Sequence, residues 1–104
     1  MQQLWDLLYA NDVDVVVSGH DHDYERFAPQ DADGNANPER GIRQFVVGTG
    51  GAELRPFATV IANSEARIAG TYGVLALVLG DRQYAWAFVD TSGRVRDRGS
   101  GVCH

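Results

Sequence analysis

The sequence predicts a mixed α/β chain, an α+β fragment with one N-terminal helix followed by mostly antiparallel strands. Three observations support this prediction. A stripe of leucines with helical spacing opens the chain, a run of β-branched residues follows it, and the second half alternates strand-like runs with Gly, Asp and Ser turns. With 104 residues, of which 44% are hydrophobic, these elements can form at most one small domain with a modest core.

The first expected elements are a short amphipathic helix and a buried strand. Leu4, Leu7 and Leu8 follow the i, i+3, i+4 spacing, and we expect the helix to end near Asn11, which tolerates a left-handed cap. Residues 13–18 are almost entirely apolar and β-branched, as in a strand covered on both faces. A helix leading directly into a buried strand is typical of the second half of a βαβ unit.

Further strands are expected at 42–47, 72–79, 84–89 and 94–98, and the two middle ones should pair as a hairpin through Gly80-Asp81-Arg82. Both faces of 84–89 are apolar, so we expect this sheet to be covered on both sides. The remaining segments are expected to be a polar surface loop at 29–41, an irregular segment at 52–70 and a flexible tail at 99–104.

Composition argues against several classes of function. The formal net charge of −5 gives no general attraction to nucleic acid or to an anionic membrane surface. No apolar run approaches the roughly 18 residues that a transmembrane helix needs. The first residues lack the features of a signal peptide, so any targeting signal of a secreted or periplasmic parent is expected upstream. Cys103 is the single cysteine, and either it pairs with a cysteine of such a parent or it lies in a loose tail.

The segment Gly19-His20-Asp21-His22 points to chemistry. It directly follows the run 13–18, where a buried strand leaves its sheet, and open α/β sheets bind ligands at the carboxyl ends of such strands. Two imidazoles at this point can serve one metal ion or one each of two adjacent ions. His20 and His22 are therefore the candidate metal ligands. The alternative is that both are loop histidines satisfied by hydrogen bonds.

Two His-x-His families fit the sequence poorly. The metallo-β-lactamase motif continues to Asp-His, where this chain has Tyr24 and Glu25. Amidohydrolases carry the pair on a strand of a barrel, which needs far more chain than this.

The string from Val13 to Arg26 closely resembles the last metal-binding block of calcineurin-like metallophosphoesterases. It is most similar to the purple acid phosphatase branch, in which Gly-His-x-His-x-Tyr-Glu-Arg recurs. A leucine-rich helix before the strand, a Phe-Val-Val-Gly-Thr-Gly-Gly segment after it and a closing Tyr-Gly-Val-Leu-x-Leu strand pair extend the resemblance over nearly the whole chain. By this resemblance, residues 1–104 are expected to be the C-terminal segment of a four-layer α/β sandwich.

The resemblance implies metal-dependent hydrolysis of a phosphate monoester, or of a diester. His20 would ligate the second ion of a two-metal site and His22 the first, the ions being iron together with zinc, manganese or iron. Two such cations stabilise the attacking and leaving oxygens of an in-line displacement and lower the pKa of the attacking water.

The other ligands of that family come from blocks that this sequence does not contain, among them Gly-Asp-x-x-Tyr and Gly-Asn-His. Gly80-Asp81-Arg82-Gln83-Tyr84 matches the first of these in letters, but it follows the His-x-His block and lies in an expected hairpin. We therefore expect the chain alone to be inactive and its partner to be the missing N-terminal part of the same domain. The alternatives are a non-catalytic metal-binding or interaction module, and a fragment with no independent existence.

Other residues have weaker functional interpretations. Tyr24 is expected to pack beside the site or to border the substrate pocket, and Arg26 to pair with a carboxylate. The glycine-rich segment 48–51 lacks the lysine and the spacing of a P-loop, so we expect a tight turn that can line the cleft. Arg55 is expected to be a surface charge rather than a contact for an anionic substrate. The aromatic row of the strand 84–89 is expected to be core.

Overall fold

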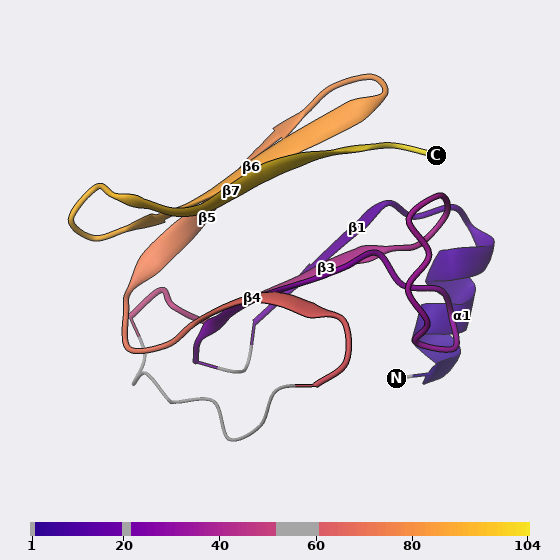
Figure 1. Ribbon diagram of the computed structural model, residues 1–104, viewed down its shortest axis with the longest axis horizontal. Coiled ribbons are helices and arrows are strands. Elements are labelled where there is room, and N and C mark those ends of the chain that lie inside the picture. Colours follow the sequence, from indigo (N-terminus) through magenta and orange to yellow (C-terminus); the bar gives the residue numbers. More distant parts are fainter. Residues whose placement is uncertain (1, 20–21, 52–60) are drawn as a thin grey trace.

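The computed structural model describes residues 2–19, 22–51 and 61–104, which form one helix and two stacked sheets (Figure 1). This arrangement confirms the mixed α+β class with mostly antiparallel strands. Helix α1 spans Gln2–Ala10. The four-stranded sheet has the order β1-β3-β2-β4, and the three-stranded sheet has the order β5-β6-β7. The strands are β1 (Val15–Ser18), β2 (Tyr24–Phe27), β3 (Arg43–Val47), β4 (Ser64–Ile68), β5 (Gly73–Leu79), β6 (Gln83–Asp90) and β7 (Val95–Val102).

The four-stranded sheet contains one parallel pair. β1 and β3 run in the same direction, in a register that places Val15 opposite Arg43 and Ser18 opposite Val46. β2 is antiparallel to both of its neighbours, β3 and β4. Because the parallel strands β1 and β3 end at the same edge of the sheet, the segments that follow Ser18 and Val47 leave it side by side.

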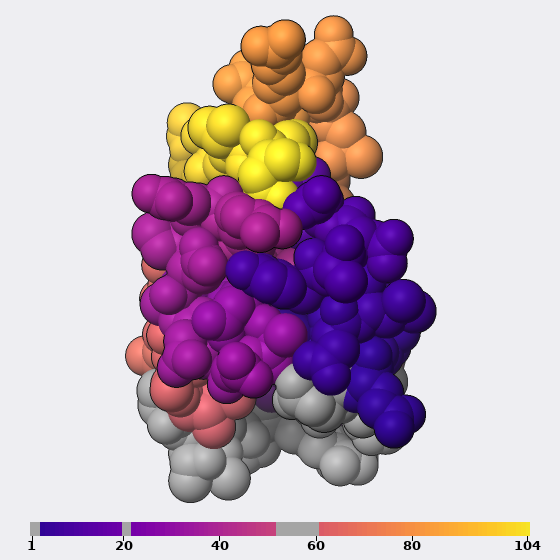
Figure 2. All heavy atoms as spheres, turned by 90° about the vertical axis from the view of Figure 1, so that its right-hand side faces the viewer, coloured from indigo at the N-terminus to yellow at the C-terminus, as the bar shows by residue number. Residues whose placement is uncertain are grey.

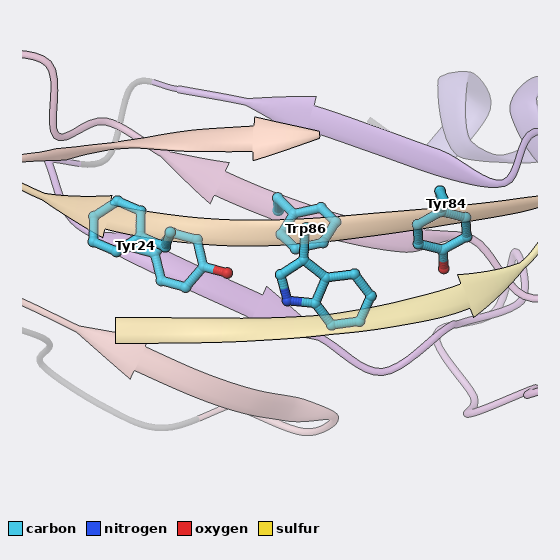
Figure 3. Packing of buried hydrophobic residues seen from close by; sticks show 5 residues of the cluster. Tyr24, Tyr84 and Trp86 are labelled. Atoms are coloured by element: carbon cyan, nitrogen blue, oxygen red, sulfur yellow. The ribbon is translucent and has the colours of Figure 1, made fainter. Parts of the chain in front are cut away.

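The core lies between the two sheets and is mainly aromatic. Figure 3 shows Tyr24, Trp86 and Tyr84 in a row between the strands. The ring of Tyr24 stacks on Phe88 with 4.3 Å between centroids, and Phe45 meets Trp86 edge-on at 5.4 Å. Both geometries are favourable for aromatic pairs. The prediction that the aromatic row of the strand 84–89 belongs to the core is therefore confirmed.

The end of helix α1 differs in detail from the prediction. The left-handed residue is Asp12, with φ 56°, rather than Asn11. Asn11 closes the helix in another way, because its backbone and side-chain nitrogens both donate to the carbonyl of Leu7. In the part of the chain that the structure describes, no helix is long and apolar enough to cross a membrane.

The expectation of a flexible tail at 99–104 is wrong for most of that segment, because β7 continues to Val102. Its glycines are required by packing. A Cβ at Gly99 would lie 2.4 Å from an atom of the Trp86 ring, and one at Gly101 would lie 2.4 Å from Tyr84. Beyond the strand, the backbone nitrogen of His104 donates to Asp14 Oδ1 at 2.8 Å. Figure 2 shows this end of the chain (yellow) resting on earlier segments (indigo and magenta).

The expectation that the strands are covered on both faces is also wrong. β1 is the edge strand of its sheet, and Val17 is 50% exposed. On the hairpin, the face turned away from the core stays open, with Val74 63% and Val78 69% exposed. The apolar outer face therefore has no cover among the described residues.

Two strands lie where no strand was predicted. β2 occupies the Tyr-Glu-Arg segment, and β4 lies inside the segment expected to be irregular. Both carry charged residues whose partners come from other elements, so their sequences alone give little sign of burial. The β5–β6 hairpin and the strand end at Val47 were predicted and are confirmed.

Candidate functional site

The candidate site lies at the edge where β1 and β3 end. The chain leaves β1 through Gly19 and leaves β3 through the glycine-rich segment 48–51. The two segments touch, because the Gly48 nitrogen donates to the carbonyl oxygen of Asp23 at 2.9 Å. The fold thus brings the residue that follows His22 beside the glycine-rich turn, which begins 25 residues further along the sequence.

Of the two candidate ligands, His22 is described and His20 lies outside the described residues, as does Arg55. His22 is half-buried and precedes β2 by two residues. Asp23, which lies between His22 and the first residue of β2, is buried. The imidazole of His22 is therefore attached to a backbone segment that packing and hydrogen bonding hold at the edge of the sheet.

The described residues do not by themselves fit a two-metal centre. Among 2–19, 22–51 and 61–104, no group of three His, Cys, Asp or Glu side chains could hold a metal ion. At this edge they supply the imidazole of His22, while the nearby carboxylate of Glu25 accepts a hydrogen bond from the hydroxyl of Ser64. A metal centre at this edge would therefore require side chains other than these described ones.

The glycine-rich turn is tied to the second sheet. Thr49 is 1% exposed, and its hydroxyl donates to the carbonyl of Gly73 at 2.8 Å. The Gly73 nitrogen donates back to the carbonyl of Thr49 at 3.2 Å. This reciprocal pair holds the turn after β3 against the first residue of β5, so the candidate edge depends on both sheets.

A partly buried ionic cluster lies between the two sheets and begins next to the site, at Tyr24 and Arg26. Asp97 of β7 accepts hydrogen bonds from the Tyr24 hydroxyl at 2.6 Å and from Arg26 Nε at 2.8 Å. This confirms that Arg26 pairs with a carboxylate and that Tyr24 packs beside the edge. Arg26 also pairs with Glu65, which in turn binds Arg43. Sequence reasoning missed Asp97, because it lies 73 residues from Tyr24 in a segment expected to be a short edge strand.

The cluster is charged at neutral pH. Burial alone would raise the pKa of Asp97, but hydrogen bonds from Arg26 and Tyr24 and the charge of Arg26 outweigh it, so its pKa lies below the ordinary value. Burial and the hydrogen bond to Asp97 raise the pKa of the Tyr24 hydroxyl. Asp97 is therefore an anion that accepts hydrogen bonds from a neutral tyrosine and from an arginine cation.

A cavity of about 400 Å³ lies at the opposite end of the sheets, lined by Asp14, Arg43, Tyr84 and His104 among others. Its polar groups bind one another: Arg43 donates to the Tyr84 hydroxyl, and the His104 ring lies 3.1 Å from the carbonyl of Gly41. The segment 80–84 also lies at this end, because Tyr84 contacts the first residue of β3. The Gly-Asp-x-x-Tyr match is thus far from the candidate edge, as the sequence argument expects.

Comparison of the chain with protein-family models, with curated proteins and with solved structures gives no match.

Proposed function

We propose that this chain is the C-terminal segment of a calcineurin-like metallophosphoesterase of the purple acid phosphatase type, whose complete form hydrolyses phosphate esters. One observation supports the proposal most strongly. Gly19, which opens the Gly-His-x-His segment, follows the carboxyl end of β1, which is parallel to β3, and Asp23, the residue after His22, is bonded to the turn that ends β3. Ligand sites of open α/β sheets occupy this position.

In this proposal His20 and His22 are the ligands that the chain contributes, one to each of two ions. The ions are iron together with zinc, manganese or iron, and imidazole nitrogens suit such borderline metals. When bound, they would polarise the phosphate oxygens and activate a water molecule. The remaining ligands would come from the N-terminal part of the domain, since the described residues contain no group of three side chains that could hold a metal ion.

The proposal also gives the two sheets a place in a larger fold. They would be the facing inner layers of a four-layer α/β sandwich. The open edge of β1 and the exposed apolar side of the β5–β7 sheet would then be where the rest of the domain packs. An exposed apolar face of this kind is common at interfaces and unusual on an isolated soluble domain.

Metal titration tests the ligand assignment. Without the remaining ligands the two histidines can hold an ion only by sharing it, so we expect the chain to bind Zn²⁺ weakly and either single substitution, His20→Ala or His22→Ala, to abolish that binding. His104→Ala is the matched control, because His104 binds Asp14 and Gly41 at the opposite end of the sheets. Zn²⁺ binding that persists in each of the two histidine variants, or that is lost in His104→Ala, would contradict the assignment.

Hydrolysis of p-nitrophenyl phosphate tests whether the site of the chain alone is incomplete. The chain alone should give no steady turnover with Zn²⁺, Mn²⁺ or Fe²⁺, because two imidazoles leave most of the coordination sphere to water. Turnover by the chain alone that His20→Ala removes would show that the site is complete. Zinc binding without turnover, even with an added N-terminal polypeptide that carries the Gly-Asp-x-x-Tyr and Gly-Asn-His blocks, would favour a non-catalytic metal-binding module.

A further inference from the structure

We propose that Asp97 is a positioning residue for His22: it holds the start of β2 against the second sheet and thereby fixes the point at which the metal-binding segment enters β2. The inference rests on the proposed function only in naming a metal as the ligand of His22. The positioning itself is a property of the described residues.

A single carboxylate binds three side chains from two strands. Asp97 accepts from Tyr24 at 2.6 Å, from Arg26 Nε and Nη2 at 2.8 and 3.2 Å, and from Trp86 Nε1 at 3.3 Å. Two of these donors lie on β2, and the third lies on β6, the neighbour of β7. Bonds of this kind to an ionised acceptor are shorter and stronger than neutral ones. Asp97 therefore joins the two sheets at one point.

That point is two residues from His22. Tyr24 is fully buried and stacks on Phe88, so its ring and its hydroxyl are both held by the second sheet. The carbonyl of Asp23 accepts from Gly48. Both contacts lie on the C-terminal side of His22, so the backbone that leads from His22 into β2 is held by the turn after β3 at Asp23 and by the second sheet at Tyr24.

Metal affinity depends on such support. Removing a group that orients a ligating histidine typically lowers metal affinity by about 10- to 100-fold. Asp97 does not touch His22 in this arrangement but sets the backbone from which His22 projects. The second sheet would then contribute to the metal site although none of its residues is a ligand.

The substitution that tests this role should still fold. In Asp97→Asn the Arg26 cation keeps Glu65 as a partner, and Arg26 also lies over the Trp86 ring, 5.2 Å from its centroid. Tyr24→Phe is a milder variant, because it removes the hydroxyl and keeps the stacked ring. Either variant loosens the link between β2 and β7.

Asp90→Asn is the matched control. Asp90 is a buried carboxylate on the same sheet, and it accepts from the nitrogen and hydroxyl of Ser92 and from the nitrogen of Arg94. These partners belong to the β6–β7 turn and make no bond to β2. Loss of this carboxylate should lower stability without affecting the position of His22.

Two measurements give separate answers. Without metal, we expect Asp97→Asn and Tyr24→Phe to speed hydrogen exchange of the Gly48 amide by about tenfold and to shift the His22 ring signals, whereas Asp90→Asn does neither. With Zn²⁺, we expect the first two variants to weaken binding by about tenfold. Native Gly48 exchange and native His22 signals in both variants would overturn the inference. Wild-type chain that binds no Zn²⁺ would overturn the proposed function alone, and the exchange result would still decide the positioning role.

Discussion

At the scale of single residues, the glycines of β7 lie in an ordered strand because packing leaves no room for a side chain, although a glycine-rich sequence favours a flexible chain. Gly99 has no room for a side chain, because a Cβ would lie 2.4 Å from the Trp86 ring. We expect Gly99→Ala to destabilise the protein by about 1–3 kcal/mol, since the ring or the strand must move. Urea unfolding measures this change. Gly50→Ala is the control, because no atom lies within 4 Å of its Cβ position, and equal stability losses in both variants would refute the packing argument.

The loss of stability at low pH should also depend on individual carboxylates. The pKa of Asp97 is lowered, and hydrogen bonds from Ser92 and Arg94 lower the pKa of Asp90 to about 2. A carboxyl with a lowered folded-state pKa contributes its full stability above the unfolded pKa of about 4 and loses it as the pH falls through the folded value.

We therefore expect the free energy of unfolding to fall steadily between about pH 5 and pH 2. Asp97→Asn and Asp90→Asn should each be less stable at pH 7 and should show a flatter slope over the same range. Denaturant titrations at several pH values measure the slopes. Slopes in both variants equal to that of the wild type would show that other groups carry the acid response.

At the scale of elements, the strands that were predicted are those with mostly apolar sequences. β1, β3 and the β5–β6 hairpin have such sequences and were found close to their expected bounds. β2 and β4 were missed because their charged residues are satisfied by partners distant in the sequence: Arg26 binds Asp97, and Glu25 binds Ser64. Local sequence carries no sign of such pairs, so these strands could not be predicted from it.

The open face of the β5–β7 sheet gives a prediction for this element. Val74 and Val78 project from β5 away from the core and are 63% and 69% exposed. We expect Val74→Lys and Val78→Lys to change stability by no more than about 0.5 kcal/mol and to reduce self-association. Sedimentation and urea unfolding measure the two effects. Leu77→Lys on the opposite face should unfold the protein, because Leu77 packs against the core cluster; a Val78→Lys variant that is equally destabilised would show that the face is covered.

At the scale of the whole molecule, the candidate site could be predicted only in part. The two histidines of the His-x-His pair are separated by one residue and directly follow a predicted strand, so the sequence alone is enough to predict a metal site there. Its support is not visible, because Asp97 and Gly73 reach the site from the second sheet. The relation between a metal segment and a distant carboxylate depends on how the sheets stack, and no local pattern encodes that.

The same stacking predicts that the two sheets unfold together. Trp86 lies between them, edge-on to Phe45 and under the guanidinium groups of Arg26 and Arg43. We expect Trp86→Ala to cost about 3–5 kcal/mol, which is a large share of the stability of a small domain. Trp86→Phe should keep enough stability for measurement.

Trp5 of α1 then provides an independent fluorescence signal, because it is the only tryptophan left in Trp86→Phe. Its indole nitrogen donates to the backbone carbonyl of Asp31. In Trp86→Phe, the fluorescence of Trp5 and the amide exchange of β6 should report one transition at a lower denaturant concentration than in the wild type. Leu79→Ala is the control, since Leu79 is 73% exposed. A variant in which the β6 amides exchange freely while Trp5 keeps its native fluorescence would show that the sheets are separate folding units.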